Sequence, residues 1–241
     1  MDFFDNLINR KKHDCAIILG CGKSISDLTE DNIAALKNFD VWASNSFMIH
    51  KSIAPDFYHL EVKAHRNGPL VSRLSKERAK LYAGTSWVLD QTREYIFNFF
   101  DRASYSPKNI LLYPKKYRSE EHGSYFPHPS HVSVSANASM TVIADLAVRM
   151  KYDTIYVLGI DMDTSEYFWT DSAEYADVEI ENIIKTTKPD ERHPQSVHPT
   201  AHMVSYLPEF MRYNRQNFVN LSKRSLFKDV ITTAEINDVI K

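Results

Sequence analysis

The stretch Cys15-Ala-Ile-Ile-Leu-Gly-Cys-Gly-Lys-Ser24 decides the fold class of this chain. Its first five residues are a continuous apolar run, which is typical of a strand buried on both faces of a parallel sheet. Gly20 and Gly22 end this run, and Thr29 can cap a helix that continues to Leu36. A strand, a glycine turn and a helix in this order predict the first unit of an α/β domain.

Strands and helices alternate along the rest of the chain. Apolar runs predict strands at residues 40–44, 57–62, 86–89, 109–113, 154–160 and 218–222, the last of the sheet. Helical spacing predicts helices at residues 69–82, 95–100, 139–150, 200–214 and from about 233. This order predicts an α/β fold, with a mostly parallel sheet and helices on both faces.

We expect two parts in the chain. Residues 1–163 and 199–241 would form the nucleotide-binding α/β domain. Residues 164–198 are acidic, aromatic and polar with little core pattern, and they are predicted to form a small flexible lid.

The balance of residue types excludes several classes of protein. The chain has 241 residues, 43% hydrophobic and 25% charged, which are the proportions of an ordinary globular enzyme. The net charge of -2 gives no basic surplus for nucleic acid. Cys15 and Cys21 flank a predicted strand and lie too far apart for a disulfide, so we expect reduced thiols and a cytoplasmic protein.

The start of the chain allows two interpretations. Phe3, Phe4, Leu7 and Ile8 precede the basic run Arg10-Lys-Lys12. A short helix here would either pack on the domain or make a peripheral contact at the inner face of the membrane. No apolar run reaches the length of about 18 residues that a membrane span needs. The sequence leaves a homo-oligomer open.

The glycine turn differs from two well-known nucleotide motifs. A Walker loop needs a glycine where Ile17 stands, and the dinucleotide fingerprint needs its third glycine where Ile25 stands. What remains is the pattern G-x-G-x-S over residues 20–24. This pattern fits either a phosphate-binding turn or a plain tight turn.

Polar residues follow several predicted strands. Ligands of an open parallel sheet bind beyond the carboxyl ends of its strands. The candidate site residues are therefore Asn45, Ser46, Glu61 to Lys63, Ser139 at a helix start, and Asp161. Asn45 could instead form an Asx turn, and Ser139 could be a plain helix cap. Asp161 and Asp163 also form a D-x-D pair, which leaves open a divalent metal bound beside a nucleotide diphosphate.

Four stretches resemble the bacterial lipooligosaccharide sialyltransferases. They are Ile17 to Ile25, Phe39 to Phe47, Tyr152 to Asp161, and His198 before a helix. The family pattern is a glycine loop, an Asn after the second strand, a Gly-Ile-Asp strand end and a downstream His. The likeness runs in order from about residue 15 to residue 215. Pro55-Asp-Phe57, together with the loop, is similar to the motility accessory factor glycosyltransferases.

The resemblance implies a Rossmann-like α/β fold with a flexible lid. It also implies a CMP-sialic acid donor as substrate, a glycan acceptor, inversion at the anomeric carbon and no required cofactor or metal. Its nucleotide-binding positions fall on Gly20, Cys21, Gly22, Lys23, Ser24, Asn45, Ser46 and Ser139. Cys21 and Lys23 stand where the family prefers Asn and Pro.

Three residues would form the catalytic group. By the resemblance, His198 is the general base that takes the proton of the acceptor hydroxyl, and His202 is its alternative. Imidazole suits this task because its ordinary pKa is about 6.5. Tyr167 would supply the hydroxyl beside the leaving phosphate, and Asp161 would anchor the nucleotide or order the site.

The sequence therefore predicts an inverting glycosyltransferase that moves a sialic acid or related nonulosonic sugar from a CMP donor to a cell-surface glycan. Two alternatives stay open. One is a pyrophosphokinase or other phosphoryl transferase, in which Asp161 and Asp163 hold magnesium and Lys23 contacts phosphate. The other is a non-catalytic nucleotide-binding module.

Overall fold

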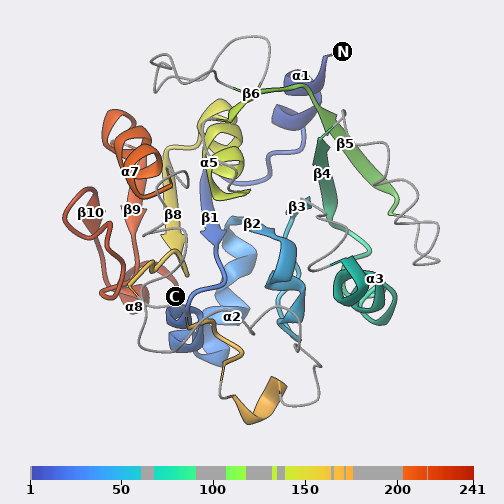
Figure 1. Ribbon diagram of the computed structural model, residues 1–241, viewed down its shortest axis with the longest axis horizontal. Coiled ribbons are helices and arrows are strands. Elements are labelled where there is room, and N and C mark those ends of the chain that lie inside the picture. Colours follow the sequence, from blue (N-terminus) through green and yellow to red (C-terminus); the bar gives the residue numbers. More distant parts are fainter. Residues whose placement is uncertain are drawn as a thin grey trace.

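An eight-stranded sheet forms the centre of the protein. The computed structural model describes residues 2–60, 68–90, 107–117, 132–134, 139–163, 166–170, 172–175, 203–215 and 217–241. The strand order is β10-β9-β8-β1-β2-β3-β4-β5, and all neighbouring strands are parallel (Figure 1). The strands are β1 (Cys15–Leu19), β2 (Asp40–Ser44), β3 (Phe57–Leu60), β4 (Ser86–Asp90), β5 (Asn109–Tyr113), β8 (Thr154–Leu158), β9 (Phe218–Asn220) and β10 (Thr232–Thr233). The predicted Rossmann-like α/β fold is confirmed.

Helices cover the sheet and connect its strands. They are α1 (Phe3–Ile8), α2 (Glu30–Ala35), α3 (Gly68–Glu77), α5 (Ser139–Arg149), α7 (Met203–Tyr213) and α8 (Ile236–Val239). Short 3-10 helices are η1 (Lys23–Asp27), η2 (Leu36–Asn38), η3 (Asn45–Ile49) and η4 (Ala173–Tyr175). A separate parallel pair is formed by β6 (Lys115–Tyr117) and β7 (Val132–Val134), which apolar patterning did not predict. Within the described ranges, no helix is both long enough and apolar enough to cross a membrane.

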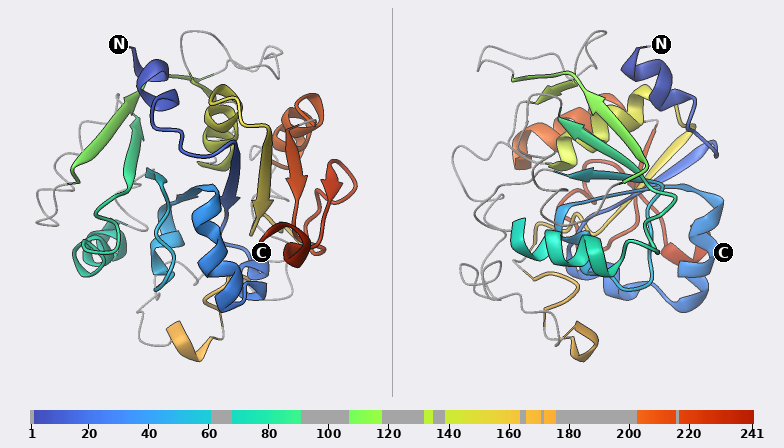
Figure 2. Two further views of the ribbon diagram at one scale, coloured as in Figure 1. Left: turned by 180° about the vertical axis from the view of Figure 1, so that it is seen from behind. Right: turned by 90° about the vertical axis from the view of Figure 1, so that its right-hand side faces the viewer.

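The sheet separates two hydrophobic cores. Ile17 and Leu19 of β1 belong to one core, and the alternating residues Ala16 and Ile18 belong to the other. In the right-hand view of Figure 2, α2 and α3 lie on one side of the strands, and α5 and α7 on the other. Because both faces are covered, every side chain of β1 after Cys15 is buried, which explains its unbroken apolar run.

Local signals set the start of α2. The side chain of Thr29 accepts a hydrogen bond from the backbone N–H of Asn32, and the Asn32 side chain accepts one from the backbone of Thr29. This reciprocal capping box confirms the predicted helix start at Thr29.

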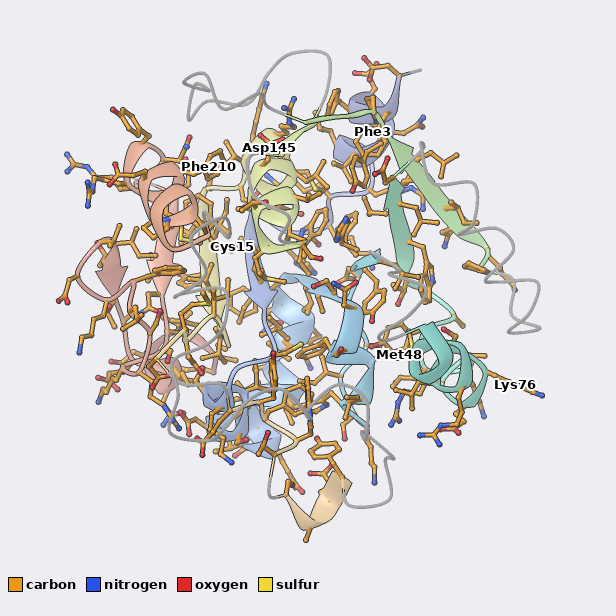
Figure 3. The ribbon with its side chains drawn as sticks, in the orientation of Figure 1. Phe3, Cys15, Met48, Lys76, Asp145 and Phe210 are labelled. Atoms are coloured by element: carbon orange, nitrogen blue, oxygen red, sulfur yellow. The ribbon has the colours of Figure 1, made fainter. Side chains whose placement is uncertain are left out.

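The leading helix packs on the domain. Leu7 of α1 is fully buried, and Phe3 contacts Tyr113 of β5 with ring centroids 6.2 Å apart. Figure 3 shows Phe3 on α1 above this edge of the sheet. Ile8 remains exposed.

Residues 218–222 are not the last strand, contrary to expectation. The side chain of Asn220 donates to the carbonyl of Ser222 and accepts from its N–H, which turns the chain out of the strand. Thr232–Thr233 then add β10 on the outer side of β9. The final helix begins at Ile236, and not near residue 233.

The order of connections reverses between β1 and β8. From β1 the chain moves outward through β2, β3, β4 and β5, whereas from β8 it moves through β9 to β10 on the other side. In open α/β sheets, ligands bind at such a switch point, beyond the carboxyl ends of the two strands. The residues that follow β1 and β8 therefore define the place to search for a site.

Candidate functional site

The glycine turn after β1 lies directly against the end of β8. The N–H of Gly20 donates to the carbonyl of Leu158 at 2.7 Å, and the N–H of Gly22 donates to that of Gly159 at 2.8 Å. A Cβ atom on Gly20 would lie 2.1 Å from the Gly159 oxygen, and one on Gly22 would lie 2.5 Å from Oδ2 of Asp161. Both glycines are therefore required by the close approach of two strand ends, with or without a ligand.

The carboxylate of Asp161 joins the segments that follow β1, β8 and β9, and we call this meeting point the junction. Its Oδ1 accepts hydrogen bonds from the hydroxyls of Ser24 at 2.6 Å and Ser222 at 2.7 Å, and its Oδ2 accepts from the Ser24 N–H at 2.8 Å. Asp161 is only 3% exposed, and Ser24 is fully buried. Because the Ser24 hydroxyl also accepts from the Gly159 N–H, Ser24 acts here as a support for Asp161.

One backbone donor of the glycine turn remains unused. Within the described part of the chain, the N–H of Cys21 donates to no other group, whereas the N–H of Lys23 belongs to the antiparallel bridge between Gly22 and Tyr167. Unpaired amides at a turn between a strand and a helix bind anions. Cys21 is thus the member of the predicted loop whose backbone N–H is free to bind phosphate.

The turn that follows β9 forms a further wall of the junction. Ser222 contacts Asp161, and Arg224 reaches Asp163 and Glu166 through its guanidinium at 3.3 Å each. Sequence patterns missed Ser222 and Arg224, because residues 218–222 were interpreted as a strand. The signal that marks them is the polar run Asn220 to Ser225, which has no apolar alternation beyond Leu221.

Asn45 and Ser139 meet at the same edge of the sheet. Asn45 follows β2 with a φ of 47°, and its side-chain amide donates to the Ser139 hydroxyl at 2.7 Å. The Tyr58 hydroxyl donates to the carbonyl of Asn45. Ser139 begins α5, whose N-terminus attracts negative charge. Ser46 is half-buried beside Asn45 in η3.

Tyr167 lies across the glycine turn. It forms an isolated antiparallel bridge with Gly22, and the N–H of the next residue, Phe168, donates to the carbonyl of Cys21 at 3.1 Å. Its ring stacks on Trp169 with centroids 4.6 Å apart. Burial, together with the nearby Cys21 thiol, raises the pKa of Tyr167 to about 12. The hydroxyl therefore stays protonated at neutral pH.

The start of the predicted lid packs into the protein. Phe168, Trp169 and Tyr175 are nearly fully buried in the same core as β1. The ammonium of Lys23 donates to the carbonyl of Thr170 at 3.0 Å, which adds a second tie between this segment and the glycine turn. We call residues 166–170 the strap. The sequence predicts few core residues between positions 164 and 198, but the aromatic residues Phe168, Trp169 and Tyr175 belong to the core.

Several predicted site residues lie outside the described residues. These are His198, His202, Glu61 to Lys63 and most of the 164–198 lid. In the ranges that are described, no three His, Cys, Asp or Glu side chains come together as metal ligands. Asp161 and Asp163 bond to hydroxyls and to Arg224, respectively. The general base, the lid and metal use remain predictions.

Fold and site together define a class: a Rossmann-like α/β protein whose polar groups gather at the switch point of its sheet. In comparisons with known proteins, no family model matches the chain. No curated protein matches it either. Among solved structures it is similar to the monofunctional alpha-2,3-sialyltransferase Cst-I from Campylobacter jejuni, at 14% identity. That match covers 93% of this chain and 81% of the other, with a TM-score of 0.45.

Proposed function

We propose that this protein is an inverting glycosyltransferase that transfers a sialic acid or related nonulosonic sugar from a CMP donor to a glycan acceptor. The observation that carries the proposal is the position of Tyr167, a protonated phenol paired by its backbone with the glycine turn. A phenol beside a phosphate-binding turn can donate a hydrogen bond to a phosphate that leaves a sugar.

The groups at the switch point match the parts of such a donor. The free N–H of Cys21 would bind the single phosphate of CMP, where the Lys23 ammonium adds positive charge. Asn45 and Ser139, at the N-terminus of α5, would bind the nucleotide from the neighbouring strand end. The sequence likeness to the lipooligosaccharide sialyltransferases assigns the same residues to the donor.

The transfer itself requires one bond to form and one to break. The acceptor hydroxyl attacks the anomeric carbon from the side opposite the phosphate, and the bond between that carbon and the phosphate oxygen breaks. The negative charge that develops on the phosphate would be stabilised by the Cys21 N–H and by the Tyr167 hydroxyl. His198 is proposed to take the acceptor proton.

Release of CMP tests the proposal. The protein is incubated with CMP-sialic acid, or with other CMP-nonulosonic acids, and a panel of oligosaccharides, and free CMP is measured by chromatography. We expect CMP release that depends on the acceptor, and a product with inverted configuration by NMR. The proposal fails if no CMP donor is consumed while a UDP or GDP sugar with manganese is.

The same assay separates the alternatives. Consumption of ATP that depends on magnesium would support a phosphoryl transferase in place of a glycosyltransferase. A non-catalytic nucleotide-binding module predicts that His198→Ala changes no activity of the protein.

A further inference from the structure

A hollow of about 400 Å³ lies at the opposite edge of the sheet from the glycine turn. Its lining includes Lys12 and His13 before β1, Lys37 before β2, and Ile53 before β3. Because each of these residues precedes a parallel strand, the hollow is at the amino ends of the strands. A strand of five residues spans about 16 Å, so the hollow is separate from the candidate active site.

The lining of this hollow is partly apolar and partly polar. Leu36, Val41 and Ile53 line it, and each is less than 5% exposed in the folded chain. Its volume falls within the range of about 300 to 1,000 Å³ that is usual for small-molecule sites. A small ligand would therefore find room there, with apolar side chains on one part of the wall.

The acidic groups at this edge are already engaged. Asp56 forms an ion pair with Lys12 and accepts the N–H of Val41 at 3.0 Å. Asp40 is fully buried and accepts hydrogen bonds from the Lys12 N–H and the Tyr152 hydroxyl. Neither carboxylate is left to attract a cation into the hollow.

Two basic residues near this edge are also engaged. The guanidinium of Arg10 donates to the Ser86 hydroxyl at 3.1 Å, and the ammonium of Lys11 donates to the carbonyl of Lys151 at 3.0 Å. In contrast, Lys37 and His13 make no side-chain hydrogen bond or ion pair within the described part of the chain. Lys37 is exposed at the rim, so its positive charge has no counter-ion there.

We propose that this hollow binds a small amphipathic anion, namely a phosphate or carboxylate group joined to a short apolar body. Lys37 and His13 would bind the anionic group at the rim, and Leu36, Val41 and Ile53 would contact the apolar body. This site is independent of the proposed transferase reaction.

Hexyl phosphate is the probe that tests the site. Titration calorimetry on the full chain should show saturable binding at one site, with hexanol and inorganic phosphate each binding at least tenfold more weakly. Lys37→Glu should raise the dissociation constant at least tenfold. Ala34→Trp, which fills the hollow from the exposed side of α2 without changing any charge, should do the same.

Lys76→Glu is the matched control. Lys76 is an exposed lysine on α3 that does not line the hollow, and it points away from the protein (Figure 3). This variant carries the same charge change and should bind hexyl phosphate within twofold of the wild type. Absence of binding to the wild type, or equal binding to Lys37→Glu, overturns the proposal.

The anion could come from a free metabolite or from a lipid headgroup. Sedimentation with phosphatidylcholine vesicles that contain phosphatidic acid separates the two sources. Co-sedimentation that Lys37→Glu abolishes identifies a lipid, whereas binding of hexyl phosphate without co-sedimentation identifies a free small molecule. Both outcomes support the site.

Discussion

The Asp161 carboxylate lies 2.8 Å from the backbone nitrogen of Ser24, a residue 137 positions earlier in the chain. Two hydroxyls share the other carboxylate oxygen, so a single buried side chain joins the segments after β1, β8 and β9. Removal of this acceptor leaves three buried donors without a partner, and each such donor costs about 1–3 kcal/mol.

Asp161→Ala is accordingly expected to lower the free energy of unfolding by about 3 kcal/mol or more. Asp163→Ala is the matched control, since Asp163 pairs with Arg224 at a partly exposed position. Exposed ion pairs contribute at most about 1 kcal/mol. Urea unfolding measures both variants, and equal losses of stability would contradict the role assigned to Asp161.

The glycine turn provides a second comparison. Gly22→Ala would bring a methyl group to 2.5 Å from Asp161 and 2.9 Å from the Gly159 oxygen, whereas a methyl group on Gly84 meets no atom within 4 Å. We expect Gly22→Ala to destabilise by about 1–3 kcal/mol, and Gly84→Ala to be neutral or stabilising. Thermal unfolding of the two variants checks this, and a Gly22→Ala protein as stable as wild type would mean that the junction can open.

Tyr167→Phe tests the chemistry with little change of shape. If the Tyr167 hydroxyl donates to the leaving phosphate, kcat for CMP release should fall about 100-fold while KM for the donor changes little. Tyr213→Phe, on the exposed surface of α7, should leave both constants unchanged. A Tyr167→Phe enzyme with full kcat would remove this residue from the mechanism.

Because His50 is buried, we expect the free energy of unfolding to depend on pH in a specific way. Its Nδ1 accepts the N–H groups of Ser52 and Ile53, and burial, aided by Arg78, lowers its pKa from 6.5 to about 4. The unfolded chain therefore binds this proton below pH 6.5, whereas the folded chain binds it only near pH 4. The stabilising contribution of His50 is present above pH 6.5 and is lost as the pH falls to 4, by about 2–3 kcal/mol in total.

His50→Asn should flatten this part of the pH profile, because its side-chain oxygen can still accept the two N–H groups but does not titrate. The measurement is urea unfolding at pH 7, 5.5 and 4. An unchanged slope in the variant would assign the acid sensitivity to other groups.

Much of this fold was predictable because its strands are buried on both faces. Continuous apolar runs at residues 15–19, 40–44 and 86–89 are distinctive, and parallel order then brings polar strand ends such as Asn45 and Asp161 to one edge. The meeting of Asn45 with Ser139 follows from this geometry.

The remaining contacts depend on tertiary structure. Phe168 and Trp169 stand in a polar stretch without periodicity, so nothing local marks them as core residues. Ser222 contacts Asp161, which lies 61 positions earlier in the chain. Until the order of the strands is known, the sequence does not distinguish Ser222 from an ordinary serine in a turn. Likewise, glycines at 20 and 22 indicate a ligand in the sequence, whereas their neighbours show that packing alone requires them.

The tie between the strap and the glycine turn affects the entropy of binding. Gly22 pairs with Tyr167, Lys23 holds Thr170, and the turn itself is anchored on β8. These segments lose their conformational freedom when the chain folds, and so they have little left to lose when a donor arrives. The affinity of the donor half of the site should therefore depend on its contacts and little on the ordering of the loop.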